Sequence, residues 1–174
     1  MLGLMQQRPL LISSCIDYAE RYRADGEVVS RLEDGRIHRT TWAAVAARSK
    51  RLARALERLG IAPGERVASF AWNHFRHLEL FFGVSGAGRV LHTVNPRLFP
   101  DQLKYIVNHA EDRAVFFDPG FAGLIIELMP HLPDVRHWIA LCDRASMPAV
   151  PGAVCYDDLL DAETDEGFDW PVLE

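Results

Sequence analysis

The chain has 174 residues, of which 49% are hydrophobic and 25% charged, and its formal net charge is −5. The length suits one domain with its own core, and the composition excludes collagen-like, disordered and disulfide-scaffold proteins. Residues 157–174 contain eight carboxylates and no lysine or arginine, so the remainder carries a small positive surplus. A surplus this small is not the concentrated basic face of a nucleic-acid-binding protein, and we expect no nucleic acid partner.

The N-terminal region and the cysteines bear on the compartment. Residues 12–15 resemble a lipoprotein cleavage box, but the apolar stretch before Cys15 is too short for a secretory signal. The sequence instead favours a short helix through Tyr22, capped by Ser13 or Ser14. No apolar run approaches the ~20 residues of a transmembrane helix. Three cysteines without Cys-x-x-Cys spacing are typical of reduced thiols, so we expect a cytoplasmic protein.

A hairpin and a long helix follow. Alternating β-like residues over 27–32 and 36–41, separated by an Asp-Gly pair, predict a β-hairpin. Apolar residues at three- and four-residue spacings predict a helix over 42–59, with Thr40 or Thr41 as its cap and Gly60 after its end. Four arginines share the other side of this helix, and they favour a solvated face over the alternative of an RNA-binding stripe: Arg48, Arg51, Arg54 and Arg58.

Strand and helix patterns then alternate. Strands are expected over 66–71, 90–94, 113–118 and 136–141, and helices over about 74–86, 100–110 and 121–129. This order predicts an α/β fold with a largely parallel sheet and helices on both faces, preceded by the hairpin. A loop over 142–152 and one helical turn over 156–160 complete the pattern. We expect an α/β subdomain over 1–156 and an acidic, solvated linker or tail over 157–174.

A glycine motif at residues 83, 86 and 88 has a spacing similar to a phosphate loop. A phosphate loop precedes a helix, whereas these glycines end one and precede a strand. The polarity therefore predicts close helix packing and a helix stop at these glycines.

Two histidines three residues apart, His74 and His77, share a predicted helix face with Glu79 nearby. A catalytic zinc requires three protein ligands, and no cysteine lies near in sequence, so we expect no metal here. We interpret His74, Arg76 and His77 as contacts with a substrate wall or a neighbouring subunit.

Two strand ends carry further candidates. Asp118 lies where open α/β sheets bind ligands, but the acidic pair and lysine of a receiver-type phosphoacceptor are missing, which favours a capping aspartate. A flavodoxin- or receiver-like signalling domain would fit the same periodicity. Asn95, Pro96 and Arg97 follow another strand end. They either meet a ligand or partner, or shape a turn in which Arg97 forms an ion pair. No nucleophile elbow is present, and Cys142 and Cys155 are expected to be buried or loop thiols.

Six stretches, in order along nearly the whole chain, resemble the N-terminal part of AMP-forming acyl-CoA synthetases, of the medium- and long-chain fatty-acid ligase type. They are Arg39–Ala43, Leu59–Ala68, Asn73–Glu79, Val90–Leu98, Tyr105–Asp112 and Phe116–Pro119. The resemblance implies the N-terminal subdomain of the adenylate-forming fold. For a full-length ligase it also implies ATP, Mg²⁺ and coenzyme A, with a fatty acid as substrate.

No position matches the family's phosphate loop, its later acidic and aromatic motifs, or its C-terminal lysine. The acidic segment ending at residue 174 resembles the approach to that loop. We therefore expect no catalytic, cofactor-binding or metal-binding residue in this chain, and no activity of the chain alone. The alternative is a non-enzymatic α/β module for self-association or partner binding. A subdomain of this kind exposes apolar surface, so we expect a homo-oligomer.

Overall fold

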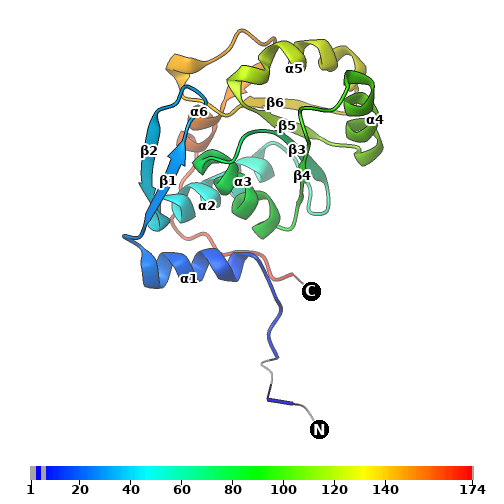
Figure 1. Cartoon of the computed structure of the whole chain (residues 1–174). Coiled ribbons are helices and arrows are strands. Elements are labelled where there is room, and N and C mark those ends of the chain that lie inside the picture. The colour runs from blue at the N-terminus through cyan, green and yellow to red at the C-terminus, as the bar shows by residue number, and fades with distance from the viewer. Residues whose placement is uncertain (1–2, 5–6, 174) are drawn as a thin grey trace.

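The structure is a computed structural model that describes residues 3–4 and 7–173. Its elements begin with helix α1 and a hairpin, β1–β2, and continue as an alternating series (Figure 1). The helices are α1 (Ser13–Arg23), α2 (Trp42–Arg58), α3 (Phe75–Gly86), α4 (Pro100–Ala110), α5 (Ala122–Leu128) and α6 (Tyr156–Asp161). The strands are β1 (Glu27–Arg31), β2 (Ile37–Thr41), β3 (Arg66–Phe70), β4 (Val90–Thr93), β5 (Ala114–Phe117), β6 (His137–Ala140) and β7 (Ala153–Cys155).

Five of these strands form one parallel sheet in the order β4-β3-β5-β6-β7, while β1 and β2 pair antiparallel as a separate hairpin. The predicted fold class is confirmed. The sequence assigned no element to residues 153–155, where the edge strand β7 pairs with β6. Three residues are too few to display an alternating pattern, which is why this strand was missed.

Helices cover both faces of the sheet, and the strands explain why (Figure 1). Alternate residues of β5 face opposite sides, and all four are buried, as expected for an inner parallel strand. Val115 and Phe117 join the core under α4 and α5, whereas Ala114 and Phe116 join the core under α2, α3 and α6. Helix α1 buries Ile16 in a smaller cluster with α2 and α3.

Local signals explain the boundaries of α2. Thr41 caps the helix, with its hydroxyl accepting a hydrogen bond from the backbone N–H of Ala44 at 3.3 Å. Gly60 follows with φ of 72°, as predicted. The predicted cap of α1 is wrong: Ile12 is the N-cap, and the Ser14 hydroxyl donates to the carbonyl of Leu11 at 2.6 Å.

The glycine motif packs as predicted. A Cβ atom at Gly83 would lie 2.7 Å from Leu52 Cδ2 and 2.8 Å from the carbonyl oxygen of Ser49. This glycine therefore permits the close approach of α3 to α2. Gly88 ends the helix region with φ of 75°.

The acidic segment differs from the sequence-based expectation. Leu159 and Leu160 are buried in the core, and residues 162–173 run along α2 toward α1 instead of extending into solvent (Figure 1). The arginines of α2 are the reason, because carboxylates of this segment pair with them. The side of α2 that carries these arginines is therefore covered by carboxylates of the same chain.

Candidate functional site

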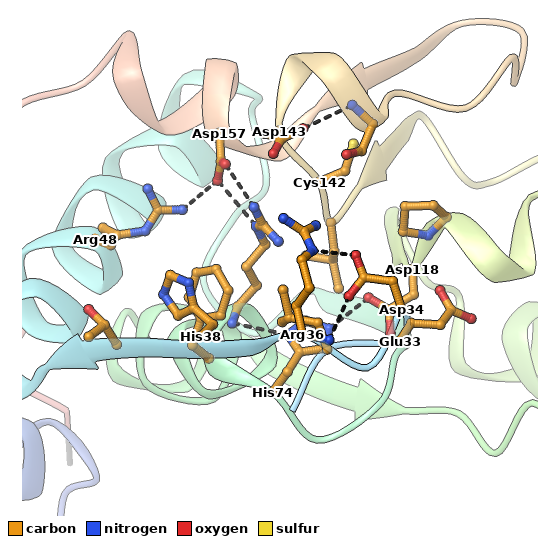
Figure 2. Close-up of a pocket in the computed structure, with 17 residues that line it drawn as sticks. Glu33, Asp34, Arg36, His38, Arg48, His74, Asp118, Cys142, Asp143 and Asp157 are labelled. Carbon is orange, nitrogen blue, oxygen red and sulfur yellow. Dashed lines mark hydrogen bonds and ion pairs between the residues drawn. The ribbon is translucent and has the colours of Figure 1, made fainter. Parts of the chain in front are cut away.

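The most prominent hollow lies at the carboxyl ends of β3, β5 and β6 and has a volume of about 620 Å³. The chain passes from β3 to β4 on one side and then to β5 on the other, so the β3–β5 boundary is a topological switch point. Open α/β sheets bind ligands in the crevice at such a point. The hairpin, the start of α3 and the loops after β5 and β6 line the hollow (Figure 2).

Asp118 joins the ends of the two strands at the switch point. Its Oδ2 accepts a hydrogen bond from the backbone N–H of Trp72 at 2.7 Å, and its Oδ1 lies 2.7 Å from His74 Nε2. Both side chains are buried. The expected capping role is wrong, because Asp118 does not cap the turn that follows it but reaches back to the β3–α3 loop.

His74 is the N-cap of α3. Its Nδ1 accepts from the backbone N–H groups of Arg76 at 3.2 Å and of His77 at 3.5 Å. With Nδ1 accepting, the proton resides on Nε2, which donates to Asp118. Both ring nitrogens are thus occupied by structural bonds, which leaves His74 no lone pair for a metal or substrate.

A buried charge network forms the back of the hollow. Arg48 Nε donates to Glu79 Oε1 at 2.7 Å, and its Nη2 donates to Asp157 Oδ1 at 2.6 Å. Arg76 also binds Asp157, at 2.8 Å, and the Tyr156 hydroxyl donates to Glu79 Oε2 at 2.9 Å. These bonds hold the start of α6 against α2 and α3.

Burial and charge act in opposite directions on the two carboxylates of this network. Burial raises the pKa of Glu79, against the opposing effect of Arg48. Burial would also raise the pKa of Asp157, but the hydrogen bonds and charges of Arg76 and Arg48 outweigh it and lower that pKa.

The hairpin forms the outer wall of the hollow. The ring of His38 stacks on Phe75 with centroids 3.8 Å apart, and burial, with the charges of Arg76 and Arg48, lowers the His38 pKa. At the hairpin tip, Glu33 accepts a hydrogen bond from the backbone N–H of Gly120 at 3.2 Å. A side chain at position 120 would collide with this carboxylate, so the glycine permits the tip to dock.

The thiols of Cys142 and Cys155 are buried, as expected. Cys142 lines the hollow, and burial, together with the neighbouring Cys155, raises the Cys142 pKa to about 12. A thiol with this pKa is not a nucleophile near neutral pH.

The structure separates the other candidate residues. His77 lies 3.2 Å from the Ser69 hydroxyl, so it shares no ligand position with Glu79. Over the described part of the chain, no three His, Cys, Asp or Glu side chains are grouped to hold a metal ion. Of the six predicted contact residues, His74 and Arg76 line the hollow and His77 does not.

The remaining three, Asn95, Pro96 and Arg97, lie after β4, outside the lining of the hollow. Asn95 Oδ1 accepts from the backbone N–H of Arg97 at 3.0 Å, which is the turn-shaping arrangement considered above. Arg97 lies 5.9 Å from the ring centre of Trp72, a cation–π contact instead of the expected ion pair.

Sequence reasoning missed His38, Arg48 and Asp157 as residues of the hollow. The arginine was assigned to a solvated helix face and the aspartate to a solvated tail. The signal that could have joined them is charge complementarity: an arginine-rich helix and a segment with only acidic charges occur in the same chain.

Comparison with known proteins places the chain among enzymes of one kind. A family described as AMP-binding enzyme matches residues 17–165. The 3-methylmercaptopropionyl-CoA ligase of Ruegeria lacuscaerulensis is 46% identical over 100% of this chain and 32% of its own length. The long-chain-fatty-acid–CoA ligase of Thermus thermophilus is 44% identical over 86% of this chain and 27% of its own length.

The fold agrees with solved structures. The crystal structure of an anthranilate CoA ligase in complex with anthranoyl-AMP superposes with a TM-score of 0.79 at 19% identity, covering 96% of this chain and 31% of that one. The chain thus spans about a third of the length of the proteins that it matches. Among the described residues, no helix has the length and apolar character required to cross a membrane.

Proposed function

The chain belongs to the family of AMP-binding enzymes, and from that premise we propose that it is the N-terminal part of an ATP-dependent acyl-CoA ligase acting on a fatty acid. The observation that carries the proposal is similarity along the whole chain to a CoA ligase of which the chain spans about a third.

The proposed reaction of the complete ligase has two steps. A carboxylate oxygen attacks the α-phosphorus of ATP, the bond to the β-phosphate oxygen breaks, and pyrophosphate leaves. The thiolate of coenzyme A then attacks the acyl carbonyl, and AMP leaves as the thioester forms. The first step brings a carboxylate to a polyphosphate, so it requires Mg²⁺ and uncommitted cationic or N–H donors around the developing charge.

The hollow does not offer that donor set. Arg48 is bound to Glu79 and Asp157, Arg76 to Asp157, and Arg36 to Asp34. These carboxylates already neutralise the guanidinium groups that a polyphosphate would require. We therefore propose that this chain supplies scaffold and wall to the ligase, not catalytic groups, and that it has no ligase activity alone.

Within this scaffold we propose that Asn95, Pro96 and Arg97 contact the substrate wall or a neighbouring subunit. Arg97 is exposed and stacks on Trp72, whose own side chain is 40% exposed. We also propose a cytoplasmic homo-oligomer. Large apolar side chains lie exposed on several elements, which favours association through them: Val29, Phe81, Phe99, Tyr105 and Val154.

One observation favours the alternative of a non-enzymatic binding module. A second hollow of about 610 Å³, lined by Val28, Val29, Leu78 and Phe81, is mostly apolar and has no catalytic group in its lining. The gene separates the two proposals. Continuation in frame past codon 174 into a Ser/Thr/Gly-rich phosphate loop would support the ligase, whereas a stop codon there would support the module.

A further inference from the structure

The segment after α6, residues 162–173, lies along the arginine-bearing side of α2 and ends beside α1 (Figure 1). We call it the C-terminal strap. Arg51 Nε donates to Asp165 Oδ1 at 2.8 Å, and Arg58 Nε donates to Glu163 Oε1 at 2.5 Å. Arg54 binds the strap backbone, donating to the carbonyl of Glu166 at 2.7 Å. The three arginines therefore contact successive points of the strap.

Two glycines of the motif at residues 83–88 form a seat for the end of the strap. A Cβ atom at Gly86 would lie 2.8 Å from the ring of Trp170, and one at Gly88 would lie 2.9 Å from Leu173 Cδ2. An aromatic ring cannot shift as a flexible side-chain end can, so a side chain at position 86 would displace Trp170.

Trp170 also contacts the first helix. Its Nε1 donates to Asp17 Oδ1 of α1 at 2.9 Å, while its ring lies on Gly86 of α3. Phe168 packs edge-on against Trp170, with ring centres 4.9 Å apart. One side chain thus connects α1, α3 and the strap.

We propose that the strap is a positioning device: Trp170, seated on Gly86, anchors it, and the arginines of α2 align it, so that the polypeptide leaves the domain in one fixed direction. The ion pairs are partly exposed and individually weak, which makes the aromatic seat the dominant contact. Only what the strap would position, the later part of a ligase, rests on the proposed function.

The test is cleavage of the strap in the 174-residue chain by a glutamate-specific protease, at Glu163 and Glu166. We expect Gly86→Ala to accelerate this cleavage at least tenfold, because the added methyl group unseats Trp170. Gly123→Ala is the matched control: it also lies in a helix, and its Cβ would meet nothing within 4 Å. We expect it to be cleaved at the wild-type rate.

Two further variants make the test decisive. Trp170→Ala is expected to accelerate cleavage as much as Gly86→Ala, and the double variant no further. Arg51→Ala with Arg58→Ala should remove the acceleration by salt that we expect for the wild type. Cleavage of Trp170→Ala at the wild-type rate, or of the wild type as fast as in denaturant, would overturn the proposal. Neither outcome depends on ligase activity, so the proposed function can fail separately.

Discussion

The Tyr156 hydroxyl donates a 2.9 Å hydrogen bond to Glu79 Oε2, and both side chains are buried. The two residues are far apart in sequence, one on α6 and the other on α3. Glu79 accepts from Arg48 with its second oxygen. A buried carboxylate held by both partners fixes how α6 meets α2 and α3, which is how the back of the hollow takes its shape.

Arg48→Ala should therefore be strongly destabilising. Removing one partner of a buried ion pair leaves an uncompensated charge, which costs about 3–5 kcal/mol of unfolding free energy. Tyr156→Phe should cost less, about 1.5–3 kcal/mol, since one hydrogen bond to a charged group is lost. Urea denaturation measures both. Arg39→Ala, which breaks an exposed pair with Glu27, is the control with no measurable change expected; equal losses in Arg39→Ala and Arg48→Ala would contradict this account.

Asp157→Asn should lower stability at neutral pH and make it less sensitive to acid. Arg76 and Arg48 outweigh burial and hold the Asp157 pKa below its usual value of 3.8. A depressed pKa contributes stability above pH 3.8 that is lost as pH falls through the folded-state value. Glu79 acts in the opposite sense, because burial raises its pKa, but it is common to both proteins.

Denaturation midpoints of wild type and Asp157→Asn between pH 7 and pH 3 measure this effect. We expect the difference between them to be largest near neutral pH and to shrink as the pH falls below 3.8. A difference that stayed constant across the range would show that the charge of Asp157 contributes nothing.

Gly83→Ala should destabilise the contact between α2 and α3. The added Cβ would approach Leu52 Cδ2 and the backbone oxygen of Ser49 at under 3 Å, and overpacking of this kind costs about 1–3 kcal/mol. Gly123→Ala, with open space around it, should be neutral or stabilising by up to about 1 kcal/mol, since alanine favours helix. Thermal unfolding compares the two. The same sign of effect in both variants would contradict the packing role of Gly83.

Thiol labelling should distinguish the three cysteines. Cys15 is exposed, whereas Cys142 and Cys155 are buried, and burial raises the Cys142 pKa to about 12. A disulfide reagent at pH 8 should modify one thiol rapidly in the native protein and three in denaturant. Cys15→Ser should abolish the rapid phase. Rapid reaction of a second native thiol would contradict the burial of the pair.

Local and repeating patterns made most of the fold predictable. The Asp-Gly hairpin, the Thr41 cap and the strand–helix alternation depend on neighbouring residues, which a single sequence displays directly. Strand β7 was missed because three residues carry no period, and its partner β6 is distant along the chain. The Ser13 and Ser14 caps were wrong because Ile12 begins α1 without a side-chain bond.

The candidate site was less predictable, since its contacts join distant segments. His74 was expected at a helix start, but its bond to Asp118 crosses from α3 to the end of β5. The acidic segment was interpreted as solvated because its charges were considered alone. Its carboxylates are bound by arginines more than 100 positions earlier, a pairing that only the fold brings about.

Pyrophosphate release tests the central claim most directly. The 174-residue chain and the polypeptide extended along its gene would be assayed side by side with ATP, Mg²⁺, coenzyme A and a fatty acid. We predict release by the extended polypeptide and none above background by the chain alone, because its guanidinium groups in the hollow are bound to carboxylates. Release catalysed by the chain alone, or by neither protein, would contradict the account.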